Sequence, residues 1–213
     1  MTEWFKVVRP DMSSFADPTF VYEVGKRMRP NGVRVDGVLC RPGYLHASPT
    51  PPEAALLNAR WPYRLLRVEG TPAVKEGPKA GFKQLTVVEE RPVSECFGPN
   101  GVEVLRVIRR AEQLTAAETR VGDAAWDAAW DAARDAAWDA AWCAAWCAAR
   151  CAAWNAAWCA AWNAARDGAW DAATAVAVRP LIGQHGFTQQ HFDTLVDPWL
   201  KVLGPTWEAD DDR

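Results

Sequence analysis

The chain has 213 residues, with 24 Lys and Arg against 27 Asp and Glu, and therefore a formal net charge of −3. This length suits one or two compact units, and the charge balance lacks the basic excess of a nucleic-acid-binding protein. The first residues lack the pattern of a secretory signal, and no apolar run of about 18 residues is present to span a bilayer. We therefore expect a soluble, cytoplasmic protein without a membrane span.

Residues 1–98 combine short β-branched and aromatic runs with turn dipeptides, which is typical of a small α+β head domain. Asn-Gly and Asp-Gly dipeptides mark turns between strands. Two prolines open a short helix, because Pro suits the first helical turn. The predicted strands are 5–9, 20–24, 33–35, an extended segment over 38–48, 63–68 and 82–88, and the predicted helix is 53–59.

Two sequence motifs stand out in this domain. They read Phe-Val-Tyr-Glu-Val-Gly-Lys at 20–26 and Leu-Cys-Arg-Pro-Gly-Tyr-Leu-His-Ala-Ser at 39–48, before a Pro-led helix and the strand Arg-Leu-Leu-Arg-Val-Glu-Gly at 64–70. This order resembles an uncharacterised domain family associated with bacteria and phages, with the pattern Tyr-x-Val-Gly-Lys, then Cys-x-x-Gly-(Phe/Tyr/Leu)-His. The chain departs from that pattern by Leu45, which lies between Tyr44 and His46.

The resemblance covers roughly residues 5–92. The segment 182–199 is similar to the ends of Ala/Trp-repeat proteins from high-GC actinobacteria and their phages. The family has no established activity, so the resemblance informs organisation more than chemistry. A phage origin would place the protein in the host cytoplasm.

The head domain also resembles, in the order of a few side chains, the scattered His/Tyr/Ser/Glu layout of ADP-ribosyltransferase-like folds. The resemblance implies that His46 or Ser48, with Tyr22 nearby, contacts a nicotinamide nucleotide, and that Glu89 or Glu90 orients the nucleophile. We favour the simpler interpretation, in which His46 is a half-buried strand residue and the two Glu form a solvated strand end. The reason is that no Gly-rich phosphate loop is present, and fold-level analogy does not establish function.

Residues 99–122 predict helices that connect the head domain to the second half of the chain. Apolar residues recur at helical spacing over 102–111. Thr115 followed by Glu118 is a capping box, which predicts another helix start.

From Asp123 to Thr174 the chain repeats one four-residue word thirteen times: Asp, Cys or Asn, then two Ala, then Trp or Arg. Only Gly168 and Thr174 depart from that alphabet. Ala is the best helix former, and the run lacks Pro, so we predict one long, nearly continuous helix over 123–175. Such a helix would be roughly 80 Å long. The predicted fold class is therefore α+β, a small β-rich N-terminal domain followed by α-helices including this one.

The period of the repeat does not match the α-helix. A step of four residues overshoots a full turn by about 40°, so the Trp wind around the helix and form no single apolar stripe. Three outcomes stay open: the helix is surrounded by copies of itself or by the other domain, it loosens toward π-like turns, or it stands partly exposed with Trp lying over Ala. We favour the first, because exposed apolar surface on this scale marks an interface.

The large side chains of the words are the predicted interaction residues. The Arg recur every sixteen residues. They could stack on Trp or contact anions, or their spacing could result from duplication of a block of words. We favour duplication, because these Arg do not share a helix face. The set is Trp126, Trp130, Trp138, Trp142, Trp146, Trp154, Trp158, Trp162, Trp170, Arg134, Arg150 and Arg166.

Four cysteines occupy the first position of the word: Cys143, Cys147, Cys151 and Cys159. Neighbours one turn apart could share a metal ion or an oxidant, but four ligands do not converge on one straight helix. We interpret them as small apolar residues and expect neither a metal nor a cofactor.

The C-terminal part predicts a helical segment over 180–205 and an acidic tail over 206–213. Phe192, Leu195 and Trp199 share one side of a helix that begins near residue 188 and that Pro198 would kink or split.

Three functions from different classes remain. The leading hypothesis is a non-enzymatic interaction or assembly protein, whose repeat helix packs against a second copy or an unidentified protein. The first alternative is an enzyme with an ADP-ribosyltransferase-like or other nucleotide-binding head domain. The second alternative is binding of single-stranded nucleic acid by Trp and Arg, which the Asp-rich words and the net charge disfavour.

Overall fold

The computed structural model describes residues 3–32, 39, 43–57, 59–128, 132–148, 151–164 and 170–204. The chain divides into two compact units, Met1–Cys96 and Phe97–Arg213. The first contains antiparallel β-sheets and the second contains α-helices, so the predicted α+β class is confirmed.

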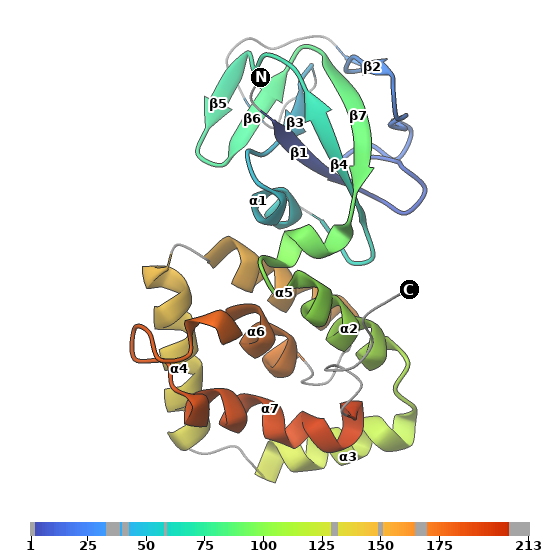
Figure 1. The fold of residues 1–213 in the computed structure, drawn as a ribbon. Helices are drawn as coiled ribbons and strands as arrows, with labels where there is room; N and C mark the ends of the chain where they lie inside the picture. Colours follow the sequence, from blue (N-terminus) through green and yellow to red (C-terminus); the bar gives the residue numbers. More distant parts are fainter. Residues whose placement is uncertain are drawn as a thin grey trace. The chain divides into compact units, whose positions relative to one another are not determined.

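Two antiparallel sheets form the first unit (Figure 1). One has the order β1-β4-β7-β2 and the other the order β3-β6-β5. The isolated bridge between Phe5 and Ser48 joins the end of β3 to β1, through reciprocal backbone hydrogen bonds of 2.7 and 2.8 Å. The strands are β1 (Trp4–Val8), β2 (Arg27–Met28), β3 (Leu45–Ala47), β4 (Arg64–Glu69), β5 (Val74–Glu76), β6 (Lys79–Phe82) and β7 (Leu85–Arg91).

Side chains from both sheets meet in one hydrophobic core. Trp4 packs edge-on against Phe82 with ring centroids 5.3 Å apart, and Phe20 packs edge-on against Tyr22 at 5.0 Å. A short helix, α1 (Pro51–Leu56), begins at Thr50, whose side chain accepts a hydrogen bond from the Glu53 amide. The core is therefore continuous between the sheets, and the loop segment that holds Phe20 and Tyr22 contributes to it.

The predictions for this unit are confirmed in part. The strands predicted near 5–9, 63–68 and 82–88 correspond to β1, β4 and β7. The segment 20–24 is not a strand, because only Val21 forms a bridge, with Ser13. The β5–β6 hairpin was not predicted, since its turn is Gly77-Pro78 and β5 has only three residues. The predicted strand 33–35 lies outside the described residues.

Helices make up the second unit, and α6 lies in its middle (Figure 1). Every residue from Asp171 to Val178 of α6 is buried, because α2, α4, α5 and α7 all contact this helix. The Asn100 side-chain amide donates to the Val176 carbonyl at 3.0 Å, which fixes the start of α2 against α6. The helices are α2 (Gly101–Glu112), α3 (Ala116–Ala128), α4 (Ala132–Cys147), α5 (Cys151–Ala164), α6 (Trp170–Val178) and α7 (Gln189–Leu203), with 3-10 turns η1 (Val93–Phe97, which straddles the unit boundary) and η2 (Arg179–Leu181).

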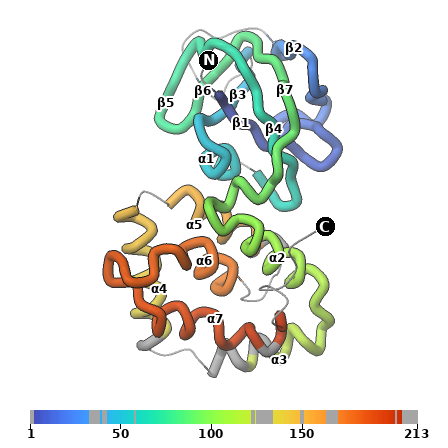
Figure 2. The backbone as a smooth tube through the Cα atoms, in the orientation of Figure 1, coloured from blue at the N-terminus to red at the C-terminus, as the bar shows by residue number. Residues whose placement is uncertain are grey.

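The prediction of one long helix over 123–175 is wrong. The repeat contributes to four helices, which run in different directions rather than end to end (Figure 2). The rings of Trp138 and Trp170 lie 5.1 Å apart, centroid to centroid, whereas on one straight helix these residues would be about 48 Å apart. The described repeat residues are α-helical except Ala148, which lies in a turn, and none of them shows the π-like turns that the sequence left open.

Alanine explains how the repeat folds back on itself. On α4, the buried face consists of Ala137, Ala141, Ala144 and Ala145, together with Arg134. On α5 the buried alanines are Ala153, Ala156, Ala157, Ala160 and Ala161. Small side chains let helix backbones approach closely, and two adjacent Ala in every word provide such a face on each helix. The apolar partners expected from other copies are therefore supplied within the chain.

The remaining helix boundaries follow local sequence signals. α3 begins after Thr115, whose hydroxyl and amide both bond the Glu118 carboxylate at 2.8 Å, as the capping box predicts. The repeat therefore does not start its own helix at Asp123, because α3 runs through Gly122. At the C-terminal end, α7 is confirmed, with Thr188 as its cap and Pro198 inside it. The acidic tail lies outside the described residues.

None of the helices in the described ranges is both long enough and apolar enough to cross a membrane.

Enlarging a buried alanine should test the close packing of the repeat helices. Ala157 on α5 is fully buried, whereas Ala136 on α4 is exposed. We expect Ala157→Leu to lower the free energy of unfolding by about 1–3 kcal/mol or more, because overpacking forces the helices apart. The control Ala136→Leu should change it by less than about 0.5 kcal/mol. Urea unfolding measured by circular dichroism compares them, and equal effects would contradict alanine-mediated packing.

Candidate functional site

The seven repeat tryptophans whose side chains the structure describes form one connected aromatic network in the second unit. Trp138 is its centre, with ring centroids 4.8 Å from Trp154 and 5.1 Å from Trp170. From there the contacts extend in two directions. One branch runs through Trp154 to Trp142 and Trp146, and the other through Trp170 to Trp158 and Trp162. The spiral that sequence predicts on one helix becomes a cluster once the helices fold together.

The network is buried at its centre and open at its ends. Trp154 is 2 % exposed, whereas Trp142, Trp146 and Trp162 are 36 %, 67 % and 50 % exposed. Trp146 carries the largest exposed fraction among these rings, and soluble proteins seldom leave such a side chain in water without a reason. The described Trp thus divide into packing residues and surface residues, a distinction that the uniform words do not reveal.

One face of α4 presents a continuous exposed stripe. In its first half the exposed residues are Asp135, Ala136 and Asp139, and in its second half they are Trp142, Cys143, Trp146 and Cys147. The spacing of three and four residues places them on one side of the helix, opposite the buried Ala face. The second half carries no charged side chain, so it is an apolar patch of two turns. We call Trp142, Cys143, Trp146 and Cys147 the α4 patch.

Arg134 has a structural role that sequence analysis missed. Arg134 is 6 % exposed, and its Nε donates at 3.0 Å to Oδ2 of Asp171, which is 1 % exposed, while Nη2 lies 2.9 Å from the same oxygen. This buried ion pair joins α4 to α6. Arg134 is therefore not on the surface, where the hypothesis of an anion contact by the repeat arginines would require it. Trp130, Arg150, Arg166 and the side chain of Trp126 lie outside the described residues.

A second candidate site lies in the first unit, at two adjoining cavities of about 450 and 60 Å³. Lys6 of β1, His46 of β3 and Lys79 of β6 line both of them. The three residues come from distant parts of the chain, and the pairing of β3 with β1 and β6 brings them together. The larger cavity also has Tyr22 in its wall. His46 and Tyr22 were predicted from the sequence motifs, whereas the two lysines were not, because neither belongs to a motif.

Positive charge and burial shape the ionisation of this cluster. Burial, followed by the nearby Lys79, lowers the pKa of Lys6 to about 8. Burial, with Lys79 and Lys6 adding to the effect, lowers the pKa of His46 to about 4. At neutral pH the imidazole is therefore uncharged. The lowered pKa values of Lys6 and His46 show that further positive charge is disfavoured here, so the site favours the arrival of negative charge.

The five weak catalytic candidates do not come together. Tyr22 and His46 line the larger cavity and Ser48 lines the smaller one. Glu89 and Glu90 are held elsewhere on β7, where Glu89 accepts from Arg67 Nε at 2.7 Å and Glu90 accepts from Arg64 Nε at 2.8 Å. These hydrogen bonds are the largest cause that lowers the pKa of each carboxyl group.

Because both glutamates serve as ion-pair partners on the four-stranded sheet, the predicted grouping of a Glu with His46 is not seen among the described residues.

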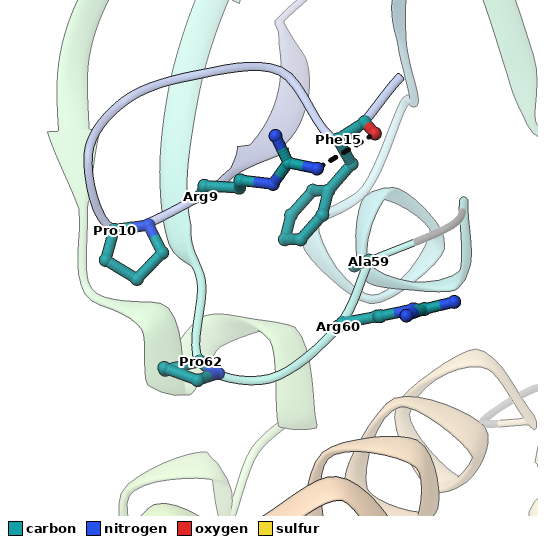
Figure 3. A pocket seen from close by; sticks show the side chains of 6 residues that line it. All are labelled: Arg9, Pro10, Phe15, Ala59, Arg60 and Pro62. Atoms are coloured by element: carbon teal, nitrogen blue, oxygen red, sulfur yellow. Dashed lines mark hydrogen bonds between the residues drawn. The ribbon is translucent and has the colours of Figure 1, made fainter. Parts of the chain in front are cut away.

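A further hollow of about 690 Å³ is lined by Arg9, Pro10, Phe15, Ala59, Arg60 and Pro62 (Figure 3). Arg9 lies over the Phe15 ring, 5.5 Å from its centroid, and donates to the Phe15 carbonyl at 3.4 Å. Arg60 extends away from Arg9. The two guanidinium groups do not converge, so this hollow offers a weaker anion site than the lysine–histidine cavity.

The cysteines that the structure describes form no disulfide, and Cys143 and Cys147 are the exposed ones among those in the repeat. Burial raises the pKa of Cys159, which favours its thiol form. In the part of the chain that the structure describes, no three His, Cys, Asp or Glu side chains gather closely enough to hold a metal ion.

Comparisons of the chain with protein-family models, with curated proteins and with solved structures find no match. The resemblance to a bacterial and phage domain family therefore stays a prediction, and the functional argument depends on the geometry of the two sites.

Removing one partner of the buried ion pair should destabilise the second unit. We expect Arg134→Met to cost about 3–5 kcal/mol of unfolding free energy, because Asp171 is left as a buried, uncompensated charge. The double variant Arg134→Met/Asp171→Leu should recover most of that loss. Urea unfolding of the four members of the cycle measures the coupling. A single-variant loss below about 1 kcal/mol would show that the pair is not buried as described.

The pKa of His46 predicts a pH dependence of stability. In the folded chain it is about 4, below its ordinary value of 6.5, so the unfolded chain binds the proton more readily. Stability should therefore fall as pH decreases from 6.5 to 4, by up to roughly 2 kcal/mol once partial solvent exposure is considered.

The variant His46→Gln should weaken this pH dependence more than the exposed control His185→Asn does. Urea unfolding across this pH range measures the effect, and an NMR titration gives the pKa of His46 directly. A pKa near 6.5 would contradict the buried cationic setting.

Proposed function

We propose that this chain is a non-enzymatic assembly protein, which forms a homodimer through the α4 patch. The observation that carries the proposal is the 67 % exposure of Trp146, beside the exposed Trp142, Cys143 and Cys147. Aromatic side chains of this kind are the anchors of protein interfaces.

A second copy of the chain is the occupant that the composition of the stripe favours. The α4 patch carries no charge, so it meets its own copy across a two-fold axis without burying an unpaired charge. The acidic half of the stripe, Asp135 and Asp139, would repel the same half of the partner. Contact is therefore favoured at the patch and disfavoured along the rest of the stripe, which defines the register of the two helices.

The size of the patch determines how strong this association is. Two Trp side chains offer a few hundred Å² per partner, since each buries about 150–250 Å² when fully covered. A stable interface of standard size needs about 800 Å² per partner. The proposed dimer is therefore a weak one that forms at micromolar or higher concentration.

Two expectations from the sequence belong to this proposal. A cytoplasmic location keeps the exposed thiols of Cys143 and Cys147 reduced. If the resemblance to the bacterial and phage family holds, that location is the host cytoplasm. Partner binding at the same patch is the alternative outcome of the experiment below.

Replacing Trp146 with Arg, the other residue that the repeat uses in the fourth position of its word, should abolish association. We expect the mass of the original chain, measured by sedimentation equilibrium, to rise from monomer toward dimer as concentration increases. Trp146→Arg should stay monomeric, because two arginines would face each other in the apolar contact. The control Val121→Arg changes a residue on α3 that is 58 % exposed and should associate as the original chain does.

Mild oxidation provides an independent check. The dimer brings the exposed Cys143 and Cys147 of two chains together, so a disulfide-linked dimer should form, and the double variant Cys143→Ser/Cys147→Ser should not form it. Equal loss of association in Trp146→Arg and Val121→Arg, or a monomer at every concentration, would overturn the proposal.

A further inference from the structure

We propose that the lysine–histidine cavity of the first unit binds a small phosphorylated molecule that carries a planar ring. The cavity is formed where β1, β3 and β6 meet, and it is lined by the amino groups of Lys6 and Lys79 and by the imidazole of His46. This site is independent of the α4 patch, since it belongs to the other unit of the chain.

The cavity has the size and the lining of a small-molecule site. Its volume of about 450 Å³ falls within the range of pockets that take drug-sized or cofactor-sized ligands. Phe20, Tyr22 and Tyr44, all buried in the unit, contribute aromatic surface to its wall. A few polar groups among apolar walls is the usual composition of such sites.

The charged groups favour a phosphoryl group. Two ammonium groups and one imidazole match the double negative charge and the several acceptor oxygens of a phosphate monoester better than the single charge of a carboxylate. Lys6 is held over the Tyr22 ring, with Nζ 5.3 Å from the centroid, and no described carboxylate lies within ion-pair distance of it. Its charge is therefore positioned at the cavity.

Asp17 is the acidic residue among those that line the cavity. Its carboxylate accepts hydrogen bonds from the Thr19 amide at 3.0 Å and the Thr19 hydroxyl at 2.6 Å, within its own loop. Hydrogen bonding from Thr19 also lowers the pKa of Asp17, so one negative charge is present against two lysines. The net charge of the cavity stays positive.

A buried hydroxyl provides a second, independent observation. Ser48 is fully buried, its Oγ makes no hydrogen bond with any described residue, and it lines the smaller cavity that shares Lys6, His46 and Lys79. Ser14 lines both cavities, and its Oγ accepts from the Ala16 amide at 3.3 Å, which leaves its proton to donate. Buried polar groups need partners, and a phosphoryl oxygen supplies them.

The charge of the whole unit supports the same ligand class. Residues 1–96 hold 14 Lys and Arg against 11 Asp and Glu, whereas residues 97–213 hold 10 against 16. The first unit is therefore positive and the second negative, which the overall net charge of −3 conceals. Such a field attracts anions to the first unit.

Calorimetry of the full chain at pH 7 tests the proposal with three probes: adenosine monophosphate, adenosine, and inorganic phosphate. We expect adenosine monophosphate to bind, phosphate alone to bind more weakly, and adenosine to bind at least tenfold more weakly than its monophosphate. Lys79→Gln should weaken binding of the monophosphate by at least tenfold. The control Lys83→Gln also removes one positive charge, but from a different surface of the unit that Arg27 and Arg29 also line. It should change the affinity for the monophosphate by less than threefold.

An NMR titration of His46 provides a readout besides affinity. The bound phosphoryl group should raise the pKa of His46 from about 4 by one or more units, because negative charge favours the protonated ring. The melting temperature of each variant shows whether it is folded, and Lys79→Arg should retain binding.

The proposal would be overturned if adenosine and its monophosphate bound with equal affinity, or if Lys79→Gln and Lys83→Gln lost the same affinity. It would also be overturned if nothing bound at millimolar concentration, or if the pKa of His46 did not change on binding.

Discussion

Close contact between alanine faces is the constraint on which the second unit depends. Each four-residue word supplies two adjacent Ala, and on α4 and α5 these residues form the buried side of the helix. Leu or Ile in the same positions would hold the helices farther apart and leave the Arg134–Asp171 pair out of reach. Alanine contributes little apolar area per residue, so the free energy of this packing depends on many contacts and on the Trp rings between the helices.

The same constraint places large aromatic side chains at the edges of the unit. Because the Trp spiral around each helix and one face of that helix is taken by alanine, some Trp point into the cluster around Trp138 and others into solvent. Trp146 is exposed for this geometric reason, and the α4 patch follows from the period of the repeat. A fold with alanine inside and tryptophan at its edge thus leaves the apolar surface on which the proposed assembly depends, while the oppositely charged first unit carries the cavity proposed to bind an anionic ligand.

The sequence predicted the helices whose starts or faces are marked by local capping residues or by apolar spacing. Capping at Thr115 and the apolar spacing of α2 and α7 were sufficient to predict α2, α3 and α7. It did not predict where the repeat turns, because every word is equally helical and the break positions depend on which Ala faces pack together. Arg134 looked like a product of duplication, since its partner Asp171 lies 37 residues away on another helix. The cavity was half predicted: His46 and Tyr22 belong to motifs, but Lys6 and Lys79 join them only through strand register.

The central claim is that the repeat folds back on itself within one chain. An NMR experiment on the monomeric Trp146→Arg variant with labelled indole rings tests it most directly, through the nuclear Overhauser effect between Trp138 and Trp170. With ring centroids 5.1 Å apart, the account predicts a strong cross-peak at high dilution. Absence of the cross-peak, or its appearance only between differently labelled chains, would contradict the account, because one continuous helix separates the two rings by about 48 Å.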